Sequence, residues 1–261
     1  MHRRAVTSSI CATILLLAVG CGREANDEAP AAPALVQSFA SAADALEART
    51  GKPGERSDMP AASDPVVQTF DEQTGKAMTA LGTDALPIDG FASFDRLCGR
   101  TANIVASYAL AGTQGLAGPA QQQRMIANVE QRLDQIFTPL LFSAHCTAEH
   151  LPFLEGRIDA SDPAKLQAVK QVQDGVAQQV LGLLQMASDS SVDADKRRRI
   201  MELAVADAPK FALGLTAAQR AQLAAAAKEV EKMLPAELRP HAQKLGAQIT
   251  QAECGKICSA L

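Results

Sequence analysis

Apolar residues recur at every third or fourth position between residues 163 and 187 of this 261-residue chain. They are Leu166, Val169, Val172, Val176, Val180, Leu183 and Ala187. This spacing places them on one face of an α-helix, whereas a half-buried strand would alternate at every second position. No segment of the sequence alternates over enough residues to predict a strand. The sequence therefore predicts an all-α fold, a globular bundle of several helices.

Shorter stripes of the same kind predict further helices on both sides of this one. They cover about 34–49, 65–81, 93–110, 193–207, 217–234 and Pro240 to about Cys254, together with a helix that begins at Pro119. Pro139 is expected to kink or end that helix, because proline removes a backbone hydrogen bond. A further segment then runs to about residue 150. Aromatic residues make up only 3% of the chain, so aliphatic residues and alanine must fill the core.

The net charge of the chain is −4, and it contains no tryptophan. A protein of this sign has no general attraction for nucleic acid or for anionic lipid. One basic run, residues 196–199, is flanked by Asp195 and Glu202 at the spacing of ion pairs within a helix. We interpret this run as a solvated helix face. The sequence therefore predicts no nucleic-acid partner.

The N-terminus has the parts of a bacterial export signal. Arg3 and Arg4 form a basic start, and an apolar stretch follows that ends in Ile14-Leu15-Leu16-Leu17-Ala18-Val19-Gly20. The stretch is shorter than the roughly 20 apolar residues of a spanning helix, so residues 1–20 are typical of a signal peptide. Ala18-Val19-Gly20-Cys21 then resembles the lipobox of bacterial lipoproteins, although the position of Ala18 is more often leucine.

The resemblance implies that signal peptidase II cleaves before Cys21, whose thiol carries a diacylglycerol and whose new amino group is acylated, for example by palmitate. Two or three chains attach a protein to a membrane lastingly, because each buried methylene contributes about 0.8 kcal/mol. Gly22 is not aspartate, so the enterobacterial retention signal is missing. The outer membrane, facing the periplasm, is therefore the expected location. The alternative is an ordinary signal peptide in which Cys21 is a chance cysteine.

Behind the signal peptide the sequence predicts three regions. Residues 21–33 contain the lipidated cysteine and a flexible tether rich in alanine and proline. Residues 34–63 comprise a helix and a linker, because the second half of this region has glycine and proline breakers and no apolar run. The helical domain spans residues 64–261. It opens at Asp64-Pro65, an N-cap followed by proline at the first helical position.

Four cysteines remain once Cys11 leaves with the signal and Cys21 is acylated: Cys98, Cys146, Cys254 and Cys258. An even number in an exported chain predicts two disulfides, with three possible connectivities. We prefer Cys98–Cys146, because both lie on apolar stripes of predicted helices, together with Cys254–Cys258, which would close a turn after the last helix. The alternative joins each C-terminal cysteine to an internal one, across loops of more than about 100 residues.

The densest group of potential metal ligands is His145, Cys146, Glu149 and His150. His145 and Glu149 are four residues apart and share a helix face, whereas the two histidines are five apart and point in different directions. No EF-hand, Walker or zinc-protease motif accompanies them. We therefore interpret the group as structural and expect no cofactor. A metal site using His145, Glu149 and His150 is the alternative.

The sequence contains no recognisable catalytic motif, so the leading hypothesis is a membrane-anchored envelope lipoprotein without enzymatic activity. Its helical domain would bind, connect or scaffold an envelope protein partner. A second hypothesis is a periplasmic carrier of a small apolar ligand between helices, to which methionines such as Met186 and Met201 are suited. The third is the metal-dependent protein described above.

Overall fold

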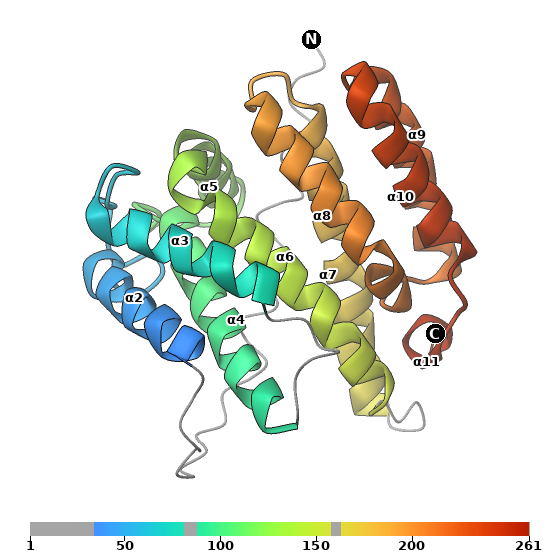
Figure 1. Cartoon of the computed structure of the whole chain (residues 1–261), viewed down its shortest axis with the longest axis horizontal. Helices are drawn as coiled ribbons and strands as arrows, with labels where there is room; N and C mark the ends of the chain where they lie inside the picture. Colours follow the sequence, from blue (N-terminus) through green and yellow to red (C-terminus); the bar gives the residue numbers. More distant parts are fainter. Residues whose placement is uncertain (1–33, 81–87, 158–162, 261) are drawn as a thin grey trace. The chain divides into compact units, whose positions relative to one another are not determined.

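The computed structural model describes residues 34–80, 88–157 and 163–260 (Figure 1). The predicted signal peptide, Cys21 and the tether of residues 21–33 lie outside these described residues. Every regular element among the described residues is a helix, which confirms the all-α prediction. The chain divides into two compact units. The first unit comprises the described residues up to Cys146, and the second unit begins at Thr147.

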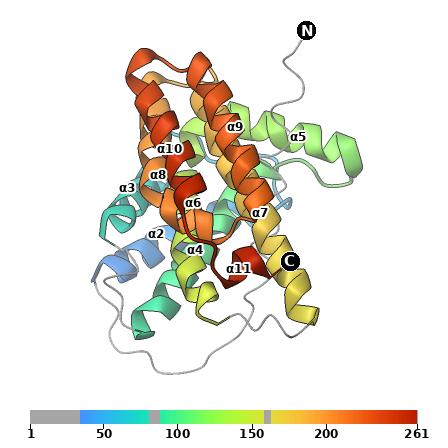
Figure 2. The ribbon, with the colours of Figure 1, turned by 90° about the vertical axis from the view of Figure 1, so that its right-hand side faces the viewer.

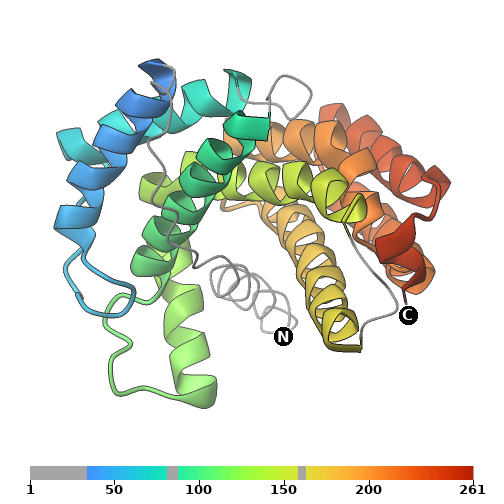
Figure 3. The same ribbon diagram turned by 90° about the horizontal axis from the view of Figure 1, so that it is seen from below.

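The first unit contains α2 (Ala34–Thr50), α3 (Pro65–Ala80), α4 (Ile88–Ala109), α5 (Gly118–Gln131) and the first part of α6 (Leu133–Glu155). Helix α2 packs against both α3 and α4, and α5 packs against α4 (Figures 1 and 3). The centroid of the Phe39 ring lies 5.4 Å from that of Phe70 and 5.7 Å from that of Phe142. The Phe94 ring lies 6.2 Å from Phe142. These rings join α2, α3, α4 and α6 in one core.

The segment between α2 and α3 is held against α4. The Tyr108 hydroxyl donates to the Pro60 carbonyl at 3.1 Å, and the Ser107 hydroxyl donates to the Gly51 carbonyl at 3.1 Å. Burial raises the pKa of Tyr108 above its ordinary value, so the phenol stays protonated and keeps donating. Residues 34–63, predicted as a helix and linker ahead of the main domain, therefore pack as part of the first unit. The division between the units falls within α6, after Cys146.

The second unit contains the rest of α6, α7 (Pro163–Ser188), α8 (Ala194–Leu213), α9 (Ala217–Met233), the 3-10 helix η2 (Ala236–Leu238), α10 (Arg239–Gln251) and α11 (Lys256–Ser259). Helices α7 and α10 each pack against both α8 and α9 (Figure 2). Two helix starts are capped by side chains. Asp193 accepts from backbone N–H groups at the start of α8, and Thr216 forms a capping box with Gln219 at the start of α9.

The apolar stripe of α7 is buried at most of its predicted positions: Val169, Val176, Val180, Leu183 and Ala187. Val172 is only half-buried, whereas the neighbouring Gln173 is buried. The Gln173 amide donates to the Ile257 carbonyl at 2.6 Å. The buried face of α7 therefore includes Gln173 because of its contact with Ile257 near the C-terminus. Helical spacing alone does not reveal this contact.

The helix predicted from Pro119 breaks at Arg132, where φ is −114° and ψ is 19°. Helix α6 then continues through Pro139 to Glu155, so Pro139 does not end the helix, which was one of the two outcomes expected of it. Proline removes one backbone hydrogen bond. Apolar side chains buried on both sides of it outweigh that loss, among them Ile136, Leu140 and Leu141.

Helix α8 likewise extends beyond its predicted end at residue 207. It runs through Pro209 to Leu213, and Phe211 and Ala212 in its last turn are buried. The extension matters for the site described below, because it places Lys210 on the same helix as Asp207.

Among the described residues, two disulfides are present, in the preferred connectivity. Cys98 of α4 pairs with Cys146 of α6, and Cys254 pairs with Cys258 around the start of α11. The C-terminal loop is also held to α6. The Glu155 carboxylate accepts the backbone N–H of Lys256 and, at 2.9 Å, that of Ile257.

Gly214 ends α8 at a point where two other side chains leave no room for a methyl group. A Cβ on Gly214 would lie 2.7 Å from Leu151 Cδ2 and 3.0 Å from Val176 Cγ2. Its φ is −84°, so alanine suits the backbone and overpacking is the main cost. We expect Gly214→Ala to lower the free energy of unfolding, measured in urea, by about 1–3 kcal/mol.

Gly246→Ala in α10 is the matched control. A Cβ there would lie 3.7 Å from the Ala227 Cβ, which is an ordinary contact. Alanine is also more favourable than glycine inside a helix by about 0.5–1 kcal/mol. We expect Gly246→Ala to be at least as stable as the wild type. Equal destabilisation by the two variants would contradict the tight packing at Gly214.

Candidate functional site

The residues that the sequence indicates on α6 have different environments. Cys146 is in the disulfide with Cys98. Glu149 is 1% exposed, whereas the next residue, His150, is half-buried and does not belong to the group of potential ligands around Glu149. His145 lies one helical turn before Glu149, on the same face of α6. The structure therefore keeps His145 and Glu149 together and separates His150 from them.

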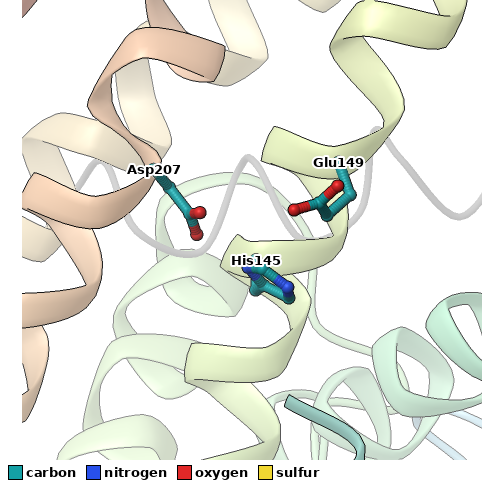
Figure 4. A group of neighbouring side chains, drawn as sticks. All are labelled: His145, Glu149 and Asp207. Atoms are coloured by element: carbon teal, nitrogen blue, oxygen red, sulfur yellow. The ribbon is translucent and has the colours of Figure 1, made fainter. Parts of the chain in front are cut away.

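Asp207 of α8 completes the group, and Figure 4 shows its carboxylate pointing toward the side chains on α6. One nitrogen of His145 and one carboxylate oxygen each of Glu149 and Asp207 lie within 4.8 Å of one another. Glu149 and Asp207 both belong to the second unit. The boundary between the units falls after Cys146, within α6. Helix α6 is unbroken there, so His145 is held one turn from Glu149 on the same helix. We call these three residues the His–Glu–Asp cluster.

Lys210 provides a positive charge beside the cluster. It lies on α8 one turn after Asp207, and its Nζ contacts Glu149 Oε1 as a salt bridge. The lysine side chain is 28% exposed, whereas the glutamate is almost fully enclosed. Asp207 is also buried, at 4% exposed. The site thus combines two buried carboxylates, one imidazole and one partly exposed ammonium.

Asp207 was not predicted from the sequence, although a signal was present. Asp207 falls on the apolar stripe of α8, in register with Ile200, Ala204 and Phe211, all of which are buried. An acidic residue on the buried face of a helix needs a partner, because an isolated buried charge is very unfavourable. Placing the helix end at residue 207 hid this pattern, since the stripe continues beyond it.

The cluster has a defined chemical capacity. An imidazole nitrogen and two carboxylate oxygens form a donor set for divalent transition metals such as Zn²⁺. Two of the donors stand at positions i and i+4 of one helix, a spacing that zinc sites on helices use. The third donor comes from a separate helix of the second unit. The arrangement is therefore suited to binding a cation.

The acidic residues near the start of α8 have a structural role. The Asp193 carboxylate caps the helix. Asp189 Oδ1 accepts from the backbone N–H and from the hydroxyl of Ser191, each at 2.8 Å. These contacts are those of a helix cap and a tight loop, and they account for both carboxylates.

The described part of the surface has a depression in each unit. The first, of about 380 Å³, lies between α8 and α10 and is lined in part by Glu202, His241 and Lys244. The second, of about 490 Å³, is lined mainly by residues 52–55 and 113–116. Both are open to solvent, and neither is the enclosed apolar cavity that a carrier of an apolar ligand needs. Met186 and Met201 are buried in the packed core.

This chain matches no protein-family model, no curated protein and no solved structure. In the described ranges, no helix combines the length and the apolar character needed to cross a lipid bilayer.

Proposed function

We propose that this chain is an exported lipoprotein, anchored through Cys21 to the outer membrane and facing the periplasm, whose helices form a binding or scaffolding module without enzymatic activity. The observation that carries the proposal is Ala18-Val19-Gly20-Cys21 directly after an apolar stretch and a basic N-terminus. A thiol at this position is the substrate of lipoprotein acylation. Two acyl chains or more anchor a protein lastingly, whereas one is marginal.

The cysteines of the helical units support export. Cys98, Cys146, Cys254 and Cys258 are all in disulfides. Disulfides persist in oxidising compartments such as the periplasm and are rare where thiols are kept reduced. This pattern leaves Cys21 as the one cysteine behind the predicted cleavage site that the two disulfides do not use.

The anchor is tested by Cys21→Ser, with Cys11→Ser as the matched control. In bacteria that express the full chain, we expect the wild type and Cys11→Ser to incorporate labelled palmitate and to sediment with membranes. Cys21→Ser is expected to lose the label and to accumulate as an uncleaved precursor. Mass spectrometry of the wild type should find an acylated N-terminal cysteine at residue 21. An unmodified Cys21 thiol, or label that persists in Cys21→Ser, would exclude the anchor.

The same pair of variants tests the scaffolding role in a strain from which the protein is deleted. We expect the deletion to sensitise cells to detergent, and we expect Cys11→Ser, but not Cys21→Ser, to restore resistance. This result follows if the module acts at the membrane. Full restoration by Cys21→Ser would show that the anchor is not needed for the role.

A further inference from the structure

The two carboxylates of the His–Glu–Asp cluster lie close together, because one oxygen of Glu149 and one of Asp207 are within 4.8 Å of each other. Both carboxylates are almost fully buried. Burying charge away from water is costly unless an opposite charge compensates it. A divalent cation between the two carboxylates would compensate both.

We infer that the His–Glu–Asp cluster is a binding site for a divalent transition metal ion of the Zn²⁺ class, with one nitrogen ligand and two oxygen ligands. With the ion bound and the Lys210 ammonium turned to solvent, Glu149, Asp207 and the cation carry no net charge. The inference does not depend on the lipid anchor. It has Asp207 in place of His150, the third residue of the metal alternative drawn from the sequence.

The geometry needs only a small adjustment. Ligand atoms around a tetrahedral zinc ion lie about 3.4 Å apart, given bond lengths of about 2.0–2.2 Å. The three donor atoms already lie within 4.8 Å of one another. Small rotations of the side chains close the remaining distance. Three protein ligands also leave a fourth position of the tetrahedron for water or for a further ligand.

The donor set selects the class of metal. Ca²⁺ takes six to eight oxygen ligands, and Mg²⁺ takes a near-octahedral set of oxygens. An imidazole nitrogen favours Zn²⁺ and its transition-metal neighbours instead. Thiolate sites are not open to the cysteines of the helical units, because Cys98, Cys146, Cys254 and Cys258 are in disulfides. A histidine and two carboxylates are thus suited to an oxidising compartment.

Lys210 is the counter-ion of Glu149 when no metal is bound. Its Nζ contacts Glu149 Oε1, and a cation on that oxygen must displace it. The four-carbon stem of lysine lets the ammonium swing outward, and the side chain already has a path to solvent because it is 28% exposed. Metal and lysine therefore compete for the same carboxylate.

The test is titration of Zn²⁺ into the full chain, purified in detergent with both disulfides intact and stripped of metal by a chelator. Isothermal calorimetry should show saturable binding of one Zn²⁺ per chain. Asp207→Asn, which keeps the size of the side chain, should weaken binding by at least about tenfold, since even losing a group that supports a ligand costs 10–100-fold. His150→Ala is the matched control and should bind as the wild type does.

Two further measurements separate the metal site from a structural cluster. Lys210→Met should bind Zn²⁺ several-fold more tightly than the wild type, because the competing ammonium is gone. Co²⁺ in place of Zn²⁺ should give visible absorption that His145→Ala abolishes, and circular dichroism should confirm that each variant is folded. The inference is overturned if the wild type shows no saturable Zn²⁺ binding, if Asp207→Asn binds as the wild type does, or if His150→Ala is as weak as Asp207→Asn. If Lys210→Met binds Zn²⁺ no more tightly than the wild type does, the metal and the lysine do not compete for Glu149.

Discussion

Cys98→Ala combined with Cys146→Ala is expected to lower the free energy of unfolding by about 4 kcal/mol. The disulfide joins residues 48 apart in the sequence. In the chain-entropy model, opening a loop of that length frees the unfolded chain by this amount at 25 °C. Both cysteines are also buried in the folded protein. Urea unfolding under non-reducing conditions measures the difference.

The second disulfide supplies the comparison for this experiment. Cys254 and Cys258 are only 4 residues apart. The same model gives a loss of about 2 kcal/mol when both become alanine. The order of the two effects is therefore predicted along with their size. If the C-terminal pair proved the more important, contacts of the terminal loop, such as those of Glu155, would outweigh loop entropy.

Lys210→Met is expected to lower the free energy of unfolding by about 3 kcal/mol when no metal is present. Removing one partner of a buried ion pair leaves the other charge uncompensated, which costs about 3–5 kcal/mol. The lower end applies because the Lys210 side chain is 28% exposed, so water already screens part of the interaction. Urea denaturation in the presence of a chelator gives this value.

The double variant Glu149→Gln with Lys210→Met tests the cause of that loss. It removes both charges of the pair, and replacing a whole buried pair is often close to neutral. We expect it to regain most of the stability that Lys210→Met loses. A double variant as unstable as the single one would mean that Lys210 contributes through packing along its stem and not through its charge.

These results bear on why the cluster exists. A buried ion pair is weak evidence for stability, because apolar residues of similar volume often do as well or better. Two buried carboxylates close to an imidazole also form a donor set for a divalent cation, and this geometry is the basis of the metal inference.

Helical periodicity was enough to locate most elements. The stripe over residues 163–187 predicted α7, and the helix predicted over 217–234 corresponds to α9. Local spacing and capping govern where a helix lies, so one sequence suffices for them. Two of the errors arose near prolines. Pro139 and Pro209 lie inside helices because burial of neighbouring side chains, a tertiary effect, outweighs one missing hydrogen bond.

The site was predicted only in part. His145 and Glu149 are four residues apart, so they lie on the same face of a helix, and both belong to the cluster. His150, the third residue of the metal alternative drawn from the sequence, does not belong to the cluster, since it is on another face of the helix. Asp207 was visible as an acidic residue on an apolar stripe, yet nothing in the spacing says which residue of another helix it faces.

The amino-acid sequence by itself determined that this chain is helical, which side of most helices is apolar, and that four cysteines are available for two disulfides. Each of these properties depends on residues close together in the chain or on simple counting. Tertiary structure alone decided that α8 brings Asp207 and Lys210 to Glu149, 61 positions before that lysine. Helix-to-helix contacts depend on how whole faces of side chains fit together, and no local period encodes that fit.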